Sequence, residues 1–134
     1  MSKVKAIIAG ADFLYMSRFV GDEETRYYLK GVNVEAGAAG GAVLASTNGH
    51  VLGAMRLAPD EARFTPDGAS FILAASKELL RAVKCAKRET SYIVCRDDRA
   101  DVVKLNSTPA DVGELESAPV TCSFPAGACY IDGT

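Results

Sequence analysis

The order of the predicted strands and helices is the feature that most narrows the folds open to this chain. Only two segments repeat apolar residues at helical spacing, and each follows one short strand and precedes three more. Hairpin-linked strands with two isolated helices predict an α+β fold, in which a βαβββ unit is duplicated and both helices lie on one side of antiparallel sheets. The strands are predicted at Val4–Ala9, Thr25–Glu35, Ala42–Thr47, His50–Leu57, Phe71–Ala74, Tyr92–Cys95, Val102–Leu105 and Val120–Phe124, and the helices at 12–20 and 76–89.

Local signals predict the ends of several of these elements. Asp12 is predicted to cap the first helix and Ser76 the second, because both side chains can accept a hydrogen bond from a helix's first turn. Asn48-Gly49 predicts a two-residue hairpin turn, since both residues tolerate a positive φ, and a second hairpin is predicted around Asp97-Asp98. Residues 58–70 contain two prolines and are predicted to form a loop. The residues of the first helix that we expect to face a core are Phe13, Met16, Phe19 and Val20.

The size and charge of the chain exclude several classes of protein. Its 134 residues predict a single domain over residues 1–134. A net charge of −2 excludes a wholly basic nucleic-acid binder but leaves room for a local basic face. No apolar run approaches the roughly 18 residues of a membrane span, so we expect a cytoplasmic protein without membrane contact. The four cysteines form no C-x-x-C pair and His50 is the only histidine, so no metal, cofactor or catalytic centre is predicted.

The second predicted helix carries four cations at the spacing of one helix face. At about 100° per residue, Lys77, Arg81, Lys84 and Arg88 fall within an arc of roughly 60°. Like charges in a row repel one another, so such a face favours a nearby anion, and the phosphates of a nucleic acid suit long flexible side chains. The alternative is the solvated face of an ordinary amphipathic helix.

Two further segments resemble a known family. Thr25–Val32 reads TRYYLKGV and Ala45–Leu52 reads ASTNGHVL. Together they resemble the middle domain of bacterial DNA polymerase III sliding clamps (β clamps), where the pattern is approximately R-Y-Y-L-N-G-V and then A-T-D-G-H-R-L. Phe124-Pro125 resembles the family's Phe-Pro near the end of that domain. Asn48 stands at the family's Asp, and Val51 at its Arg.

The resemblance implies a DNA-clamp fold and a function in binding rather than catalysis. Family rings close from about six such domains, with helices around the hole and sheets outside. Because family helices line the hole, the helix residues implied to contact duplex DNA are Arg18, Lys77, Arg81, Lys84 and Arg88. Arg26 and Tyr28 match family positions close to DNA. The residues implied to form an outer apolar pocket, which receives short hydrophobic peptides of DNA polymerases and clamp loaders, are Leu29, Thr47, Gly49, His50, Leu52 and Pro125.

Several functional alternatives remain open from the sequence. One domain cannot encircle DNA, so the resemblance implies a homo-oligomer, a part of a larger multi-domain ring, or a clamp relative with another task, for which a phage or prophage homologue is a natural source. A protein-interaction module with a clamp fold and no DNA binding is the second hypothesis. A hydrolase that uses His50 with Asp60 or a cysteine is the third, but the chain has no G-x-S-x-G motif, so no enzyme is predicted.

Overall fold

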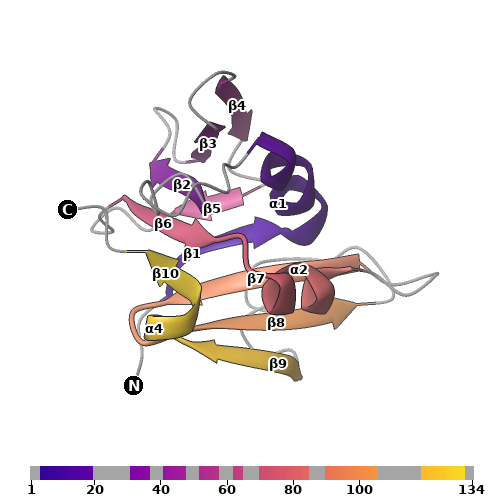
Figure 1. Cartoon of the computed structure of the whole chain (residues 1–134). Coiled ribbons are helices and arrows are strands. Elements are labelled where there is room, and N and C mark those ends of the chain that lie inside the picture. Colours follow the sequence, from indigo (N-terminus) through magenta and orange to yellow (C-terminus); the bar gives the residue numbers. More distant parts are fainter. Residues whose placement is uncertain are drawn as a thin grey trace.

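The structure is a computed structural model that describes residues 4–19, 31–36, 41–47, 52–57, 62–64, 70–84, 90–105 and 119–131. Within these ranges the chain forms two five-stranded antiparallel sheets and three α-helices. The predicted combination of antiparallel sheets with helices is therefore confirmed (Figure 1).

The first sheet has the strand order β5-β1-β7-β8-β9. Its long central hairpin joins β7 to β8, and Cys95 pairs with Ala100, which is consistent with the hairpin that the sequence predicted around Asp97-Asp98. The strands of this sheet are β1 (Val4–Ala9), β5 (Ala62–Phe64), β7 (Thr90–Arg96), β8 (Arg99–Leu105) and β9 (Val120–Pro125).

The second sheet has the strand order β10-β6-β2-β3-β4. The burial of β3 alternates strictly along the strand, because its even-numbered residues face the core and its odd-numbered residues face outward. The strands of this sheet are β2 (Gly31–Ala36), β3 (Ala42–Thr47), β4 (Leu52–Leu57), β6 (Phe71–Ala74) and β10 (Tyr130–Ile131).

Each sheet contains an inner strand from the opposite half of the chain. β1 lies between β5 and β7, so the first half of the chain completes the sheet that β7, β8 and β9 begin. In the same way β6 lies between β10 and β2, so the second half completes the sheet of β2, β3 and β4. The two halves are therefore joined by main-chain hydrogen bonds in both sheets.

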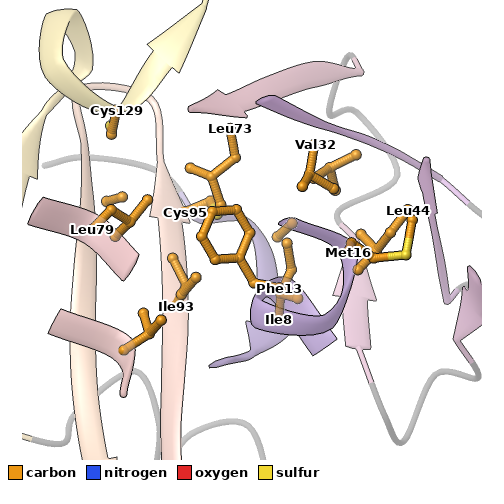
Figure 2. Packing of buried hydrophobic residues seen from close by; sticks show 14 of the residues in the cluster. Ile8, Phe13, Met16, Val32, Leu44, Leu73, Leu79, Ile93, Cys95 and Cys129 are labelled. Carbon is orange, nitrogen blue, oxygen red and sulfur yellow. The ribbon is translucent and has the colours of Figure 1, made fainter. Parts of the chain in front are cut away.

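The helices pack on these sheets around one core. Helix α1 (Gly10–Met16) continues into a 3₁₀ turn, η1 (Ser17–Phe19), and contacts β3, β4, β7 and helix α2 (Lys77–Val83). The short helix α4 (Ala126–Cys129) links β9 to β10. Figure 2 shows the core, in which side chains from both sheets and from α1 and α2 meet. Among these side chains are Ile8, Phe13, Met16, Val32, Leu44, Leu73, Leu79 and Ile93.

Two buried serines of the sheets bind the carboxyl ends of the longer helices. The Ser46 hydroxyl on β3 donates a hydrogen bond of 2.7 Å to the carbonyl oxygen of Met16, the last residue of α1. The Ser91 hydroxyl on β7 donates to the carbonyl oxygen of Val83, the last residue of α2. Each bond satisfies a carbonyl group that has no partner within its helix. The serines thus fix each helix end against a sheet.

The helix ends differ from the predicted ones. The predicted cap at Ser76 is confirmed, because its side chain accepts a hydrogen bond of 3.2 Å from the Leu79 amide. The predicted cap at Asp12 is wrong: β1 runs directly into α1, Ala9 is the N-cap, and Asp12 lies in the first turn. The predicted extension of the second helix to residue 89 is also wrong, because Lys84 has an extended backbone with ψ of 126°. Residues 85–89 lie outside the described ranges.

Three short elements depart from the predicted loops. The prediction of an uninterrupted loop over residues 58–70 is wrong, since β5 lies within it and pairs with β1. Helix α4 and strand β10 were not predicted, and they carry the chain from the first sheet to the second. Phe13 and Met16 are fully buried as predicted, and Phe19 packs partly buried against the core. Val20 lies outside the described residues.

Candidate functional site

The first candidate surface is the outward face of α2. Ser76 begins this helix, and Leu79 and Val83 bury its inner face against the core. Lys77 and Arg81 are both exposed and lie one helical turn apart, so they share the opposite face. This pair can supply two cations to an extended anion such as a nucleic-acid backbone.

The predicted row of four cations is only partly present on this helix. Lys84 is exposed, but its extended backbone places it after the end of α2 rather than at the next helical position. Arg88 lies outside the described residues. The expectation of one continuous helical row is therefore wrong, because α2 ends at Val83, where the Ser91 hydroxyl binds its last carbonyl group.

Arg18 is exposed in η1, directly after α1, and its guanidinium carbon lies 5.5 Å from the centre of the Tyr15 ring. α1, which continues into η1, contacts α2, the helix that carries Lys77 and Arg81. The other two residues that the resemblance assigned to DNA, Arg26 and Tyr28, lie outside the described part of the chain.

The second candidate surface is a hollow of about 250 Å³ on the outer face of the second sheet. Thr47 and Leu52 lie opposite each other in the ladder between β3 and β4, and both line this hollow. Leu52 is 72% exposed, so its side chain is available at the surface. The residues that line the hollow are Gly31, Asn33, Ala45, Ser46, Thr47, Leu52 and Ile72.

Small residues create this hollow. A Cβ atom on Gly31 would lie 2.5 Å from Cγ2 of Ile72 and 2.8 Å from the carbonyl oxygen of Leu73, so a side chain at this position cannot be accommodated without movement. Ala45 is another small residue of the lining. The Ser46 hydroxyl already donates to Met16, which leaves a mainly apolar surface suited to an apolar side chain of a partner.

The structure brings together two of the six residues that the resemblance assigned to a peptide pocket. Leu29, Gly49 and His50 lie outside the described residues. Pro125 lies at the end of β9 in the other sheet, opposite Arg99, and is not among the residues that line the hollow. The sequence placed Pro125 by its motif alone, and the strand order separates the two sites.

The register of β3 and β4 confirms the predicted antiparallel pairing of these two strands, in which Thr47 lies opposite Leu52. The predicted turn at Asn48-Gly49 lies outside the described residues.

An ionic cluster on the first sheet was not predicted. Asp101 is 2% exposed and accepts hydrogen bonds from Arg96 Nε at 2.9 Å, Arg99 Nε at 3.1 Å and the Ser123 hydroxyl at 2.7 Å. Burial would raise the pKa of Asp101, but the hydrogen bonds from Ser123 and Arg96 and the charges of both arginines together hold it below its usual value. The signal in the sequence was the alternation of Arg99 and Asp101 on one face of a strand.

The described residues contain no group of three or more histidine, cysteine, aspartate or glutamate side chains that could hold a metal ion. Across the same ranges, no helix is long and apolar enough to cross a membrane. Cys95 and Cys129 are buried, and Cys122 is half-buried.

Comparison with known proteins adds a structural relative. No family model and no curated protein matches the sequence. Among solved structures, the chain is similar to a DnaN sliding clamp (DNA polymerase III subunit beta) from Bartonella birtlesii bound to griselimycin, with a TM-score of 0.55 and 17% sequence identity. The match covers 100% of this chain and 33% of that one, so this chain spans about a third of the clamp's length. The likeness shows a clamp-like fold.

Proposed function

We propose that this chain is a sliding clamp-like domain that binds duplex DNA without sequence preference through the cations of its helices. The observation that carries this proposal is the pair of exposed cations, Lys77 and Arg81, on α2 of a clamp-like fold. Phosphate contacts of this kind hold a protein on DNA without reading bases. They therefore suit a processivity factor, which has to move along the duplex and performs no chemistry itself.

The proposal includes a duplicated βαβββ unit and the place of this domain in a ring. The strand orders support the duplication, because matching β1 to β6, β2–β4 to β7–β9 and β5 to β10 converts one sheet order into the other. One such domain cannot surround DNA, so the proposal requires either a homo-oligomer or a larger chain of several such domains. The coverage of one third of a known clamp supports this division.

The proposed second site is the hollow that Thr47 and Leu52 line, which would receive short apolar peptides of a DNA polymerase or a clamp loader. Its apolar walls and the exposed Leu52 side chain support this assignment. Leu29, Gly49 and His50 belong to the same proposal because each lies two positions from a lining residue in the sequence.

The experiment is to measure affinity for a labelled duplex at several salt concentrations between about 50 and 200 mM. In a Lys77→Ala/Arg81→Ala variant, the slope of log affinity against log salt should fall by about 1.8, because each phosphate that a cation neutralises contributes about 0.9 to the slope. The matched control is Arg56→Ala, an exposed cation on the outer face of β4. An unchanged slope in the double variant would remove the role that we assign to α2.

A protein-interaction module with a clamp fold is the second candidate, and the hollow favours it. The end of α2 at Val83 also leaves fewer aligned cations than a continuous helical row would supply. This function predicts binding of a short peptide of the Gln-Leu-x-Leu-Phe type together with no affinity for duplex DNA at any salt concentration. Light scattering after size exclusion separates a closed ring from a monomeric adaptor.

A further inference from the structure

The exposed side of α1 carries an aromatic ring next to an arginine. Ala11, Tyr15 and Arg18 are exposed at spacings of four and three residues, which places them along one side of α1 and η1. Tyr15 is one of the few large hydrophobic residues exposed in the described ranges, with 49% of its surface accessible. Its position matters because Arg18 follows it by one helical turn.

The Tyr15 ring is held by contacts that reach the second sheet. It meets the Phe19 ring edge-on, with 5.9 Å between the ring centres and 62° between the ring planes. Phe19 in turn lies against β4, so closely that a Cβ atom on Gly53 would be 2.6 Å from its Cδ2 atom. The glycine at position 53 therefore makes room for Phe19, and Phe19 supports one edge of Tyr15.

The guanidinium of Arg18 lies over the Tyr15 ring, 5.5 Å from its centre, within the range of a cation–π interaction. A stacked guanidinium keeps its N–H donors in its own plane, where they can bond to the oxygen atoms of a phosphate. In the described part of the chain, no hydrogen bond or ion pair engages this side chain. We infer that Tyr15 is a positioning residue, which holds Arg18 ready to contact a backbone phosphate of duplex DNA. This inference rests on the proposed function.

The test is a double-mutant cycle on duplex binding across the same salt range. Arg18→Ala should lower the salt slope by about 0.9, the value for one phosphate contact. Tyr15→Leu should weaken binding roughly two- to fivefold, which is the size of an exposed cation–π interaction. Tyr15→Phe keeps the ring and should bind like the wild type, and Tyr15→Leu should have no further effect when Arg18 is already alanine.

The outcomes separate this inference from the proposed function. If Lys77→Ala/Arg81→Ala weakens binding but the Tyr15 and Arg18 variants bind normally, the inference is wrong and the proposed function stands. Additive losses from Tyr15→Leu and Arg18→Ala would also overturn it, because the two residues would then act independently. If the wild type shows no affinity for DNA, both the inference and the proposed function are wrong. Melting temperatures of all variants show whether Tyr15→Leu acts only through stability. A purely structural role of Tyr15 would lower the melting temperature and leave the salt slope of binding unchanged.

Discussion

Thr47 lies directly opposite Leu52 in the antiparallel ladder between β3 and β4, and both residues line the same hollow. Opposite residues of such a ladder project to the same face of the sheet. A slip of one residue between the strands would move Leu52 to the core face, where Gly53 now makes room for Phe19. The register of one hairpin thus sets both the hollow and the support of α1.

Leu52→Ala should weaken the binding of a short apolar peptide by about fivefold or more, the effect expected for a central apolar contact. The Leu52 side chain is largely exposed, so the free protein should keep its stability. Calorimetric titration with the peptide measures the affinity. Arg56→Ala on the same strand is the control, and equal affinities of the two variants would exclude Leu52 from the site.

Asp101→Asn should lower the free energy of unfolding by about 3 kcal/mol, because two arginines then face a neutral group at a buried position. Asp98→Asn is the control: this carboxylate is 61% exposed and pairs with the same Arg99, so its loss should cost below about 1 kcal/mol. Chemical denaturation measures both values. Similar losses in the two variants would show that burial does not strengthen the Asp101 cluster.

The stability that Asp101 contributes should also depend on pH. Its pKa is lower in the folded protein than the unfolded value of about 3.9. The contribution is therefore fully present above that value and is lost as the pH falls through the folded pKa. The difference in unfolding free energy between the wild type and Asp101→Asn should shrink in acid. A difference that stays constant down to the lowest usable pH would contradict this.

Gly10→Ala should destabilise the fold by about 1–3 kcal/mol, since an added Cβ atom would collide with the Ser91 hydroxyl and lie 3.0 Å from the Ser91 carbonyl oxygen. Gly127→Ala in α4 is the matched control, because nothing lies within 4 Å of the added atom. That control should be neutral or stabilising by up to about 1 kcal/mol, the helix preference for alanine over glycine. Thermal unfolding compares them, and equal melting temperatures would contradict the close approach of α1 to β7.

Tyr130→Phe should destabilise the fold by about 1 kcal/mol or more, because the Tyr130 hydroxyl lies within hydrogen-bond distance of the carbonyl oxygens of Arg96, at 2.7 Å, and Arg99, at 3.0 Å. Burial, with Cys95 and Cys129 nearby, raises the pKa of the Tyr130 phenol. The contribution is thus complete below the unfolded pKa of about 10 and is lost as the pH rises from there through the folded pKa. Absorbance titration of the folded protein should therefore be the same with and without this phenol, and a difference between the two titrations would contradict its burial.

The sequence predicts the central parts of the fold and fails where pairing depends on distant residues. Val4–Ala9, Ala42–Thr47 and Phe71–Ala74 were predicted with the observed bounds, because branched and apolar residues dominate these short runs. β5 and β10 are three and two residues long, so they carry no period of their own and exist only because β1 and β6 offer free edges. Local sequence does not contain that information.

The candidate sites were likewise predicted where local sequence determines them and missed where they depend on distant residues. The α2 cations at positions 77 and 81 were predicted from spacing, whereas the end of the helix before Lys84 was not. There the last carbonyl group of α2 bonds to Ser91, a residue eight positions after Val83. Thr47 and Leu52 were identified by resemblance, but their shared hollow also needs Gly31 and Ile72 from other strands. The Tyr15–Arg18 pair could have been found from its i, i+3 spacing on a predicted helix.

The placement of β1 and β6 inside the opposite sheets has a practical consequence for protein engineering. A chain cut between β5 and β6 would give two fragments, each of which lacks a strand that the other supplies. Neither fragment could satisfy its main-chain hydrogen bonds alone, yet the pair could refold together by strand complementation. The domain is thus a natural starting point for a split reporter, whose signal appears only when two fusion partners bring the fragments into contact.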